Sequence, residues 1–256
     1  MGQDEALVSV LMTNYNYGKY IEQAVNSVVA QTHGPLELII VDDGSTDNSR
    51  EAIERLKAEI GSRFSNGVLV VHKTNGGLHS ALNAGFQHVN GETALFLDAD
   101  DMISPEYIAK ATRLLWQKRQ EGVGLVYTNS VMIHADGTLF RDLYGNAIEG
   151  KSAEFDAETL ARYNYIPGNG VTLTDALRQI FPLDLNVEPG REKHARHLAL
   201  VASGYKFLHI PEPLFFYRQH RENISGIGNT TMAQMESGTP SHFMFSGLWP
   251  KYDPNS

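Results

Sequence analysis

The chain has 256 residues, of which 42% are hydrophobic, and its 30 acidic residues outnumber 21 lysines and arginines, giving a formal charge of −9. This composition excludes a wholly disordered chain and offers no broad cationic surface for nucleic acid, which we do not expect as a partner. Because cysteine is absent, disulfides, thiolate zinc sites and a cysteine nucleophile are excluded as well.

Four strand–helix units are predicted in about the first 120 residues. Apolar, β-rich runs predict strands at 7–12, 36–41, 68–71 and 94–97. Apolar residues at helical spacing predict helices at 19–31, 47–60, 81–89 and 104–120, with Asp47 as the cap of the second and Ser104 as the N-cap of the last. Such alternation indicates an α/β fold with a mostly parallel central sheet flanked by helices.

The second half is predicted to be α+β. A strand at 126–133 leads into a hairpin turn at 135–138, helices follow at 156–163, 174–180 and 192–203, and strands return at 207–210 and 214–217. Residues 226–256 are rich in Gly, Ser, Thr and Asn and lack sustained periodicity. We expect them to form a flexible C-terminal tail or lid, in which 226–246 becomes ordered when ligands bind.

Three carboxylates follow the predicted strand at 94–97: Asp98, Asp100 and Asp101. In open α/β sheets ligands bind outside the carboxyl ends of the strands. Carboxylates crowded at such a place repel one another unless a cation holds them, and oxygen ligands favour Mg²⁺ or Mn²⁺. The alternative is an acidic turn whose side chains only satisfy backbone amides.

Two further turns face the same predicted edge. The strand at 36–41 also stops in acids, Asp42 and Asp43. Paired glycines, Gly76 and Gly77, follow the strand at 68–71 and allow backbone to approach a ligand closely, although an ordinary turn would use them too.

In order along the chain, the motifs are Val10-Leu11-Met12-Thr13-Asn14-Tyr15-Asn16, Ile40-Val41-Asp42-Asp43-Gly44-Ser45-Thr46-Asp47, Asn75-Gly76-Gly77, Asn83-Ala84-Gly85 and Leu97-Asp98-Ala99-Asp100-Asp101. With this series, from about residue 7 to 225, the chain resembles the inverting family 2 glycosyltransferases of GT-A fold. The resemblance implies a Rossmann-like nucleotide-sugar (donor) half at 1–123 and an α+β acceptor-binding and catalytic half at 124–225.

The resemblance also implies roles for individual residues. The loop after the first strand and Asp43 would hold the nucleotide base, Asp98 the ribose, and Asp100 with Asp101 a metal that bridges the diphosphate. The implied nucleotide-binding residues are Thr13, Asn14, Tyr15, Asp43, Asn75, Gly76, Gly77, Asn83, Asp98, Ala99 and Arg218. The implied ligands of Mn²⁺ or Mg²⁺ are Asp100, Asp101 and His220.

Two positions depart from the family pattern. Leu82 stands where many members carry an arginine, and Lys193 stands where members commonly carry the aspartate that acts as general base. A protonated lysine cannot accept a proton. On a helix with Ala195, Leu198, Ala199 and Ala202 facing inward, Glu192 would border the cleft and Lys193 would point away. We therefore predict Glu192 as the general base, with Glu188 in reserve.

The predicted activity is metal-dependent, inverting transfer of a sugar from a nucleotide donor to a hydroxyl of a saccharide or lipid-linked acceptor. A carboxylate at Asp43 suits uracil or thymine N3–H, so a UDP-sugar is the leading donor and a guanosine donor the alternative. The other candidate functions are a nucleotide-sugar binding module without turnover and a sugar-nucleotide pyrophosphorylase, for which the loop at 15–19 is a poor triphosphate site.

No apolar run approaches membrane-spanning length, and the acidic start is unlike a signal peptide. We therefore expect a cytoplasmic protein, either free or peripherally associated with the inner face of the membrane.

Overall fold

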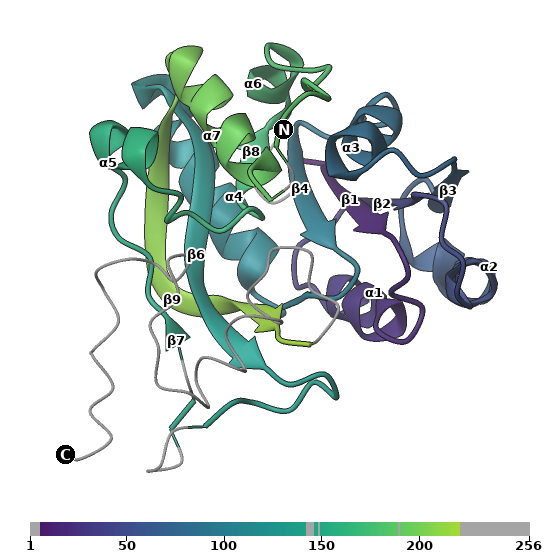
Figure 1. Cartoon of the computed structure of the whole chain (residues 1–256). Coiled ribbons are helices and arrows are strands. Elements are labelled where there is room, and N and C mark those ends of the chain that lie inside the picture. Colours follow the sequence, from purple (N-terminus) through teal and green to yellow (C-terminus); the bar gives the residue numbers. More distant parts are fainter. Residues whose placement is uncertain (1–5, 142–145, 148, 189, 221–256) are drawn as a thin grey trace.

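The computed structural model describes residues 6–141, 146–147, 149–188 and 190–220. Within them one curled, nine-stranded sheet is flanked by helices (Figure 1). The strands are β1 (Val8–Asn14), β2 (Leu36–Asp42), β3 (Val68–His72), β4 (Thr93–Asp98), β5 (Met102–Ile103), β6 (Val123–Ile133), β7 (Glu149–Gly150), β8 (Val171–Leu173) and β9 (Lys206–Arg218). Their order is β3-β2-β1-β4-β8-β6-β9-β5, with β7 paired to β6 outside this path. The predicted tail lies outside the described residues.

The helices are α1 (Ile21–Val29), α2 (Ser49–Ile60), α3 (Leu78–Phe86), α4 (Tyr107–Lys118), α5 (Ala157–Arg162), α6 (Thr174–Arg178) and α7 (Glu192–Ala202), with 3₁₀ turns η1 (Gly61–Arg63) and η2 (Arg119–Glu121). The four predicted strand–helix units are confirmed, because β1 to β4 alternate with helices and pair in parallel. In the second half, β8 runs antiparallel to both β4 and β6 and so joins the two parts into one sheet.

Two predicted strands, 207–210 and 214–217, form one continuous strand, β9. Pro211 and Pro213 lie between the two predicted strands, and proline cannot donate to a ladder. The parallel pairing with β6 accommodates them through register shifts at Thr128/Asn129 and Asn129/Ser130, opposite this stretch. Strands of two or three residues, such as β5, β7 and β8, carry too little pattern to be predicted.

Of two predicted helix caps, Ser104 is wrong, whereas the capping hydrogen bond of Asp47 is confirmed. Ser104 is not the N-cap of α4, because its carbonyl accepts the Tyr107 amide in a preceding turn and the helix is capped at Glu106. Asp47 lies one residue before the N-cap of α2, yet its carboxylate accepts the Ser49 amide at 2.9 Å as a capping side chain does.

The hydrophobic core lies on both faces of the sheet. Buried residues of α1, α2 and α4, such as Ile21, Ile53 and Ile108, pack with alternate residues of β1 and β2 on one face. On the other face Leu82 of α3 packs with the intervening strand residues, which include Leu11. A third cluster joins α5, α6 and α7 to β6 and β9. Both faces of the parallel strands are thus covered, which leaves their carboxyl ends to carry polar groups.

A buried carboxylate fixes the opposite end of the sheet. Glu37 of β2 is 3% exposed. Its Oε1 accepts from the Ser9 hydroxyl and from the Asn90 amide at 2.7 Å, and its Oε2 accepts from the side chains of Asn66 and Asn90 at 3.0 Å each. These four donors join β1, β2 and two connecting loops. They satisfy the buried carboxylate of Glu37, which is a charged residue in an otherwise apolar strand.

Candidate functional site

The register of the parallel strands assembles the predicted edge. Thr13 of β1 lies beside Asp98 of β4, and Asn14 lies beside Asp42 of β2. The Thr13 hydroxyl donates to Asp98 Oδ1 at 3.1 Å, and the Asn14 side-chain amide donates to Asp42 Oδ1 at 3.0 Å. The prediction that two strands ending in acids share one edge is therefore confirmed.

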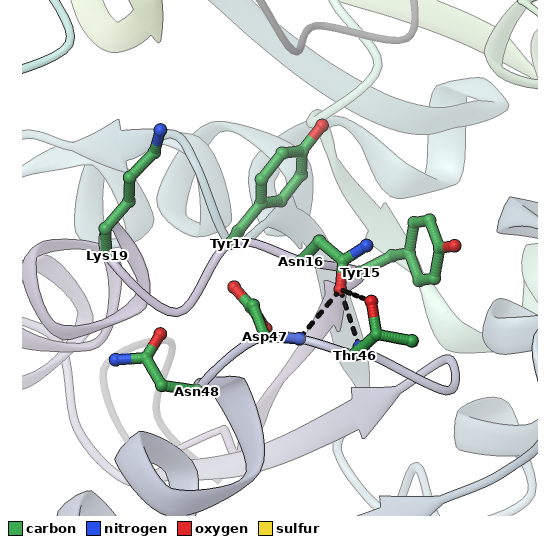
Figure 2. Close-up of a pocket in the computed structure, with 7 residues that line it drawn as sticks. All are labelled: Tyr15, Asn16, Tyr17, Lys19, Thr46, Asp47 and Asn48. Carbon is green, nitrogen blue, oxygen red and sulfur yellow. Dashed lines mark hydrogen bonds between the residues drawn. The ribbon is translucent and has the colours of Figure 1, made fainter.

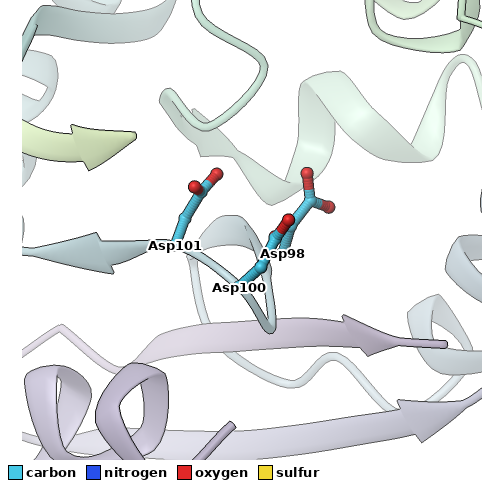
Figure 3. A group of neighbouring side chains, drawn as sticks. All are labelled: Asp98, Asp100 and Asp101. Carbon is cyan, nitrogen blue, oxygen red and sulfur yellow. The ribbon is translucent and has the colours of Figure 1, made fainter. Parts of the chain in front are cut away.

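The structure brings Asp98, Asp100 and Asp101 together at this edge. One oxygen from each lies within 4.8 Å of the others. Asp100 and Asp101 are buried, at 5% and 2% exposure, and Asp98 is partly exposed. Figure 3 shows the three carboxylates projecting to the same side of the chain that follows β4.

The charges of this acidic cluster, Asp98, Asp100 and Asp101, repel one another. Burial, and then the charges of Asp100 and Asp98, raise the pKa of Asp101 well above its ordinary value. A divalent cation would remove this penalty, and three convergent carboxylate oxygens are the donor set that Mg²⁺ or Mn²⁺ prefers. The residues present therefore fit such an ion.

Lys193 at the start of α7 pairs with Asp98 Oδ2. Burial would raise the pKa of Asp98, but the charge and hydrogen bond of Lys193 lower it. Burial would lower the pKa of Lys193, but the charges of Asp98 and Asp101 raise it. The prediction that Lys193 points away from the site is thus wrong.

The predicted inward stripe of α7 is wrong as well. The buried residues of the helix are Arg196, His197 and Leu200 rather than the alanines. Arg196 donates to the Gly168 carbonyl and lies with its guanidinium 4.8 Å from the Phe96 ring centre. The buried face of α7 is mixed, because Leu200 joins an apolar cluster whereas Arg196 packs on Phe96 of β4.

His220, a predicted metal ligand, lies at the cluster. Its Nε2 is 3.0 Å from Asp100 Oδ2, and its ring packs 4.6 Å from Tyr20 and edge-on to Tyr17 at 5.4 Å. Tyr17 lies close to the cluster through its contact with His220, and burial, followed by the charges of Asp100, Asp98 and Asp101, raises the pKa of Tyr17. The sequence analysis did not assign Tyr17 to the site, although it stands in the loop that follows β1.

Arg218, a predicted diphosphate contact, is fully buried instead. Its Nε donates to the Asp100 carbonyl at 2.6 Å, Nη1 donates to the carbonyls of His134 and Ala135, and Nη2 donates to Gln23 Oε1 at 2.7 Å. The guanidinium is engaged by protein oxygens and so anchors the acidic loop, and its role as a diphosphate contact stays a prediction.

Asp43 organises the glycine loop. Its carboxylate accepts from the amides of Gly76 and Gly77, at 3.1 and 2.8 Å, and pairs with Lys73. Gly44 packs closely on this loop, since a Cβ there would lie 2.6 Å from the Asn75 amide nitrogen. The predicted nucleotide-binding residues Asp43, Asn75, Gly76 and Gly77 therefore form one unit.

A cavity of about 580 Å³ opens next to this edge. It is lined by Tyr15, Asn16, Tyr17 and Lys19 from the loop after β1 and by Thr46, Asp47 and Asn48 from the loop after β2. Figure 2 shows Asn16 joining the two loops, because its side-chain oxygen accepts from the Thr46 amide at 2.7 Å. Tyr17 contributes both to this cavity and to the surroundings of the acidic cluster.

Three predicted residues face protein groups instead of the cluster. Asn83 exchanges hydrogen bonds with the backbone of Leu183, at 2.9 and 2.7 Å. Ala99 is buried, and its amide donates to the Thr13 carbonyl at 2.9 Å. Glu188 is exposed and pairs with Arg191 at 3.0 Å.

Glu192, the predicted general base, lies beside Lys193 at the start of α7. Its carboxylate accepts the Gly190 amide at 2.7 Å, and its carbonyl accepts from His79 at 3.0 Å. The stripe that favoured Glu192 does not exist, so the role rests on its position next to the residue that reaches Asp98.

Residues 9–181 match the family described as Glycosyl transferase family 2. An uncharacterized glycosyltransferase of Nostoc sp. is 32% identical over 179 residues, which is 69% of this chain and 54% of that protein. The chain thus spans about half the length of this relative.

Two solved structures share the fold. The mannosyltransferase PcManGT of Pyrobaculum calidifontis, in complex with GDP-Man and Mn²⁺, superposes with a TM-score of 0.62 at 19% identity, over 85% of this chain and 58% of that one. TarS 1–349 of S. aureus, in complex with UDP-GlcNAc, gives 0.61 at 17% identity, over 86% and 60%. Among the described residues, no helix is long and apolar enough to cross a membrane.

Proposed function

The chain belongs to glycosyl transferase family 2 and has the GT-A fold, and we propose that it transfers a sugar, with inversion and with a divalent metal, from a UDP-sugar to a hydroxyl of a saccharide or lipid-linked acceptor. The observation that carries the proposal is the acidic cluster, whose ligand oxygens lie within 4.8 Å of one another at the carboxyl end of β4.

The donor would be held by residues 1–123. Tyr15 at the rim of the cavity and Asp43 in the neighbouring loop would hold the base, and Asp98, oriented by Thr13 at 3.1 Å, would hold the ribose. Two fold neighbours were solved with nucleotide-sugars, UDP-GlcNAc in TarS and GDP-Man in PcManGT, which supports the donor class. The carboxylate of Asp43 favours uridine, because it can accept a hydrogen bond from the N3–H of uracil.

Asp100 and Asp101, with His220 beside them, would hold Mn²⁺ or Mg²⁺. The bound ion would neutralise charge on the nucleoside diphosphate as it leaves. Mn²⁺ is present in the PcManGT complex, which supports this cofactor class. Arg218 and Tyr20 would keep the loop of Asp100 and the ring of His220 in place.

Residues 124–225 would bind the acceptor. Glu192, at the end of α7 that reaches the cluster, would accept the proton of the acceptor hydroxyl as that oxygen attacks the anomeric carbon opposite the departing diphosphate. Attack from that side inverts the anomeric configuration. Glu188 is the reserve base, although its exposure and its pairing with Arg191 make it the weaker choice. A cytoplasmic location, either free or peripherally associated with the inner face of the membrane, would suit either acceptor class.

The second candidate is a nucleotide-sugar binding module without turnover, and Lys193 is the observation that favours it. A panel of UDP-, dTDP-, GDP- and CDP-sugars, incubated with Mn²⁺ and simple saccharide acceptors, separates the two. NMR of the anomeric proton monitors the product, and transfer with inverted configuration supports the proposal. Binding of a nucleotide-sugar with neither transfer nor hydrolysis supports the binding module.

A further inference from the structure

The ammonium of Lys193 already occupies the acidic cluster. It pairs with Asp98 Oδ2, while the Thr13 hydroxyl donates to Asp98 Oδ1 at 3.1 Å. Both side chains of the ion pair are partly buried, at 33% exposure for Lys193 and 26% for Asp98. The pair therefore lies where solvent weakens it less than at an open surface.

The stem of Lys193 is held in place by its surroundings. A Cβ added at Gly168 would lie 2.8 Å from Lys193 Cγ and 3.0 Å from Cε, so the lysine passes directly over that glycine. Arg196, one turn further along α7, donates to the Gly168 carbonyl. The lysine stem thus packs against Gly168 on its way to Asp98, and a larger side chain at 168 would displace the stem from this path.

A divalent ion at this cluster would lie within a few ångström of this ammonium and would repel it. A flexible four-carbon stem allows a lysine to change partners. When a nucleoside diphosphate enters with the ion, its phosphate oxygens offer the ammonium a new anionic partner close to Asp98.

We propose that Lys193 is a tethered cation that, through its pair with Asp98, offsets the negative charge of the acidic cluster in the free protein and moves to the donor diphosphate when metal and donor bind. This proposal rests on the proposed function of the cluster. It makes metal and nucleotide bind cooperatively, because the metal alone is repelled by the nearby lysine, whereas metal with nucleotide provides the lysine with an anionic partner. Lys193 is then a binding residue for the leaving diphosphate, at the position where family members commonly carry the general base.

The test measures binding without turnover. Lys193→Met keeps the length of the stem and removes the charge. Mn²⁺ affinity is measured by electron paramagnetic resonance without nucleotide, and UDP affinity by calorimetry at saturating Mn²⁺. A contact worth about 1.4 kcal/mol corresponds to about tenfold in an equilibrium constant. We expect Mn²⁺ alone to bind about tenfold more tightly to Lys193→Met than to wild type, and UDP with Mn²⁺ to bind about tenfold more weakly.

Two further variants sharpen the result. Gly168→Ala keeps the charge but displaces the stem, so it should also tighten binding of Mn²⁺ alone. Lys118→Met is the matched control. It removes a lysine that pairs with Glu121 at a distance of 2.8 Å and has no contact with the acidic cluster, so it should change neither the Mn²⁺ affinity nor the UDP affinity. Circular dichroism confirms folding of each variant.

The proposal is overturned if Mn²⁺ binds Lys193→Met and wild type with the same affinity. It is also overturned if Mn²⁺ binds neither protein. UDP affinity that the substitution leaves unchanged overturns the proposal too. Failure of the proposed function looks different: the two affinities shift as expected, but no nucleotide-sugar in the panel is turned over.

Discussion

The backbone amide of Arg218 donates to Asp101 Oδ1 at 2.9 Å, so the end of β9 is bound directly to the acidic cluster across 117 positions of sequence. The side chain of the same arginine reaches the Asp100 carbonyl at 2.6 Å. Two neighbouring acids are thereby positioned by one residue from the far end of the described chain. The acidic cluster is a product of tertiary structure as much as of its own loop.

Replacing Arg218 should therefore affect stability first. Arg218→Met leaves the carbonyls of Asp100, His134 and Ala135 without their donor, and unpaired buried groups cost about 1–3 kcal/mol each. We expect the free energy of unfolding in urea to fall by about 3 kcal/mol. The exposed Arg113→Met should change it by less than about 0.5 kcal/mol. A variant as stable as wild type that only loses affinity for UDP would restore Arg218 as a diphosphate contact.

Glu37 should make stability depend on pH. Although burial opposes it, hydrogen bonds from Ser9, Asn90 and Asn66 lower its pKa in the folded protein. Its contribution is therefore complete above the unfolded-state pKa, about 4.3, and is lost as pH falls through the lower folded-state pKa. Glu37→Gln should cost about 2 kcal/mol at pH 7, because it leaves mismatched donors.

Urea unfolding between pH 7 and pH 3 measures this effect. The difference between wild type and Glu37→Gln should narrow as the pH falls below about 4. Glu121→Gln, at an exposed carboxylate, is the control and should stay within about 0.5 kcal/mol throughout. A constant difference at all pH values would show that the charge of Glu37 has no part in stability.

Asp43 should select the base of the donor. A carboxylate accepts the N3–H of uracil, whereas N3 of cytosine has no hydrogen to give. In calorimetry with Mn²⁺, wild type should bind UDP more tightly than CDP, and Asp43→Asn should reduce that ratio about tenfold. Lys73→Met breaks the ion pair of Asp43 but leaves its carboxylate, so it should keep the ratio. An unchanged ratio in Asp43→Asn would mean that another group selects the base.

Glu192 should be needed for transfer but not for donor binding. Glu192→Gln removes the proton acceptor and keeps the shape, so the transfer rate should fall by about 10²-fold or more while UDP affinity is retained. Glu188→Gln, at the exposed partner of Arg191, should transfer normally. The reverse pattern would move the role to Glu188, and normal rates in both variants would exclude either residue as the base.

The parts of this molecule that could be predicted are those that regular structure determines. Asp42 and Asp98, the acids that end two predicted strands, were expected at one edge because parallel strands carry their carboxyl ends together, and the structure places both beside the end of β1. Lys193 was misplaced for a physical reason. Periodicity assumes that a buried helix face is apolar, but Arg196 is buried on α7 with its guanidinium donating to the Gly168 carbonyl, and Lys193 reaches Asp98.

Donor binding should proceed through a metal at the acidic cluster, because the ion would neutralise both the carboxylates and the diphosphate. Calorimetric titration of UDP into the protein with Mn²⁺, and again in EDTA, tests it most directly, with Asp100→Asn as the variant. We expect tight binding only for wild type with Mn²⁺, and a loss of at least about tenfold in affinity on removing either the ion or the carboxylate. Equal UDP affinity in EDTA, or in Asp100→Asn with Mn²⁺, would contradict it.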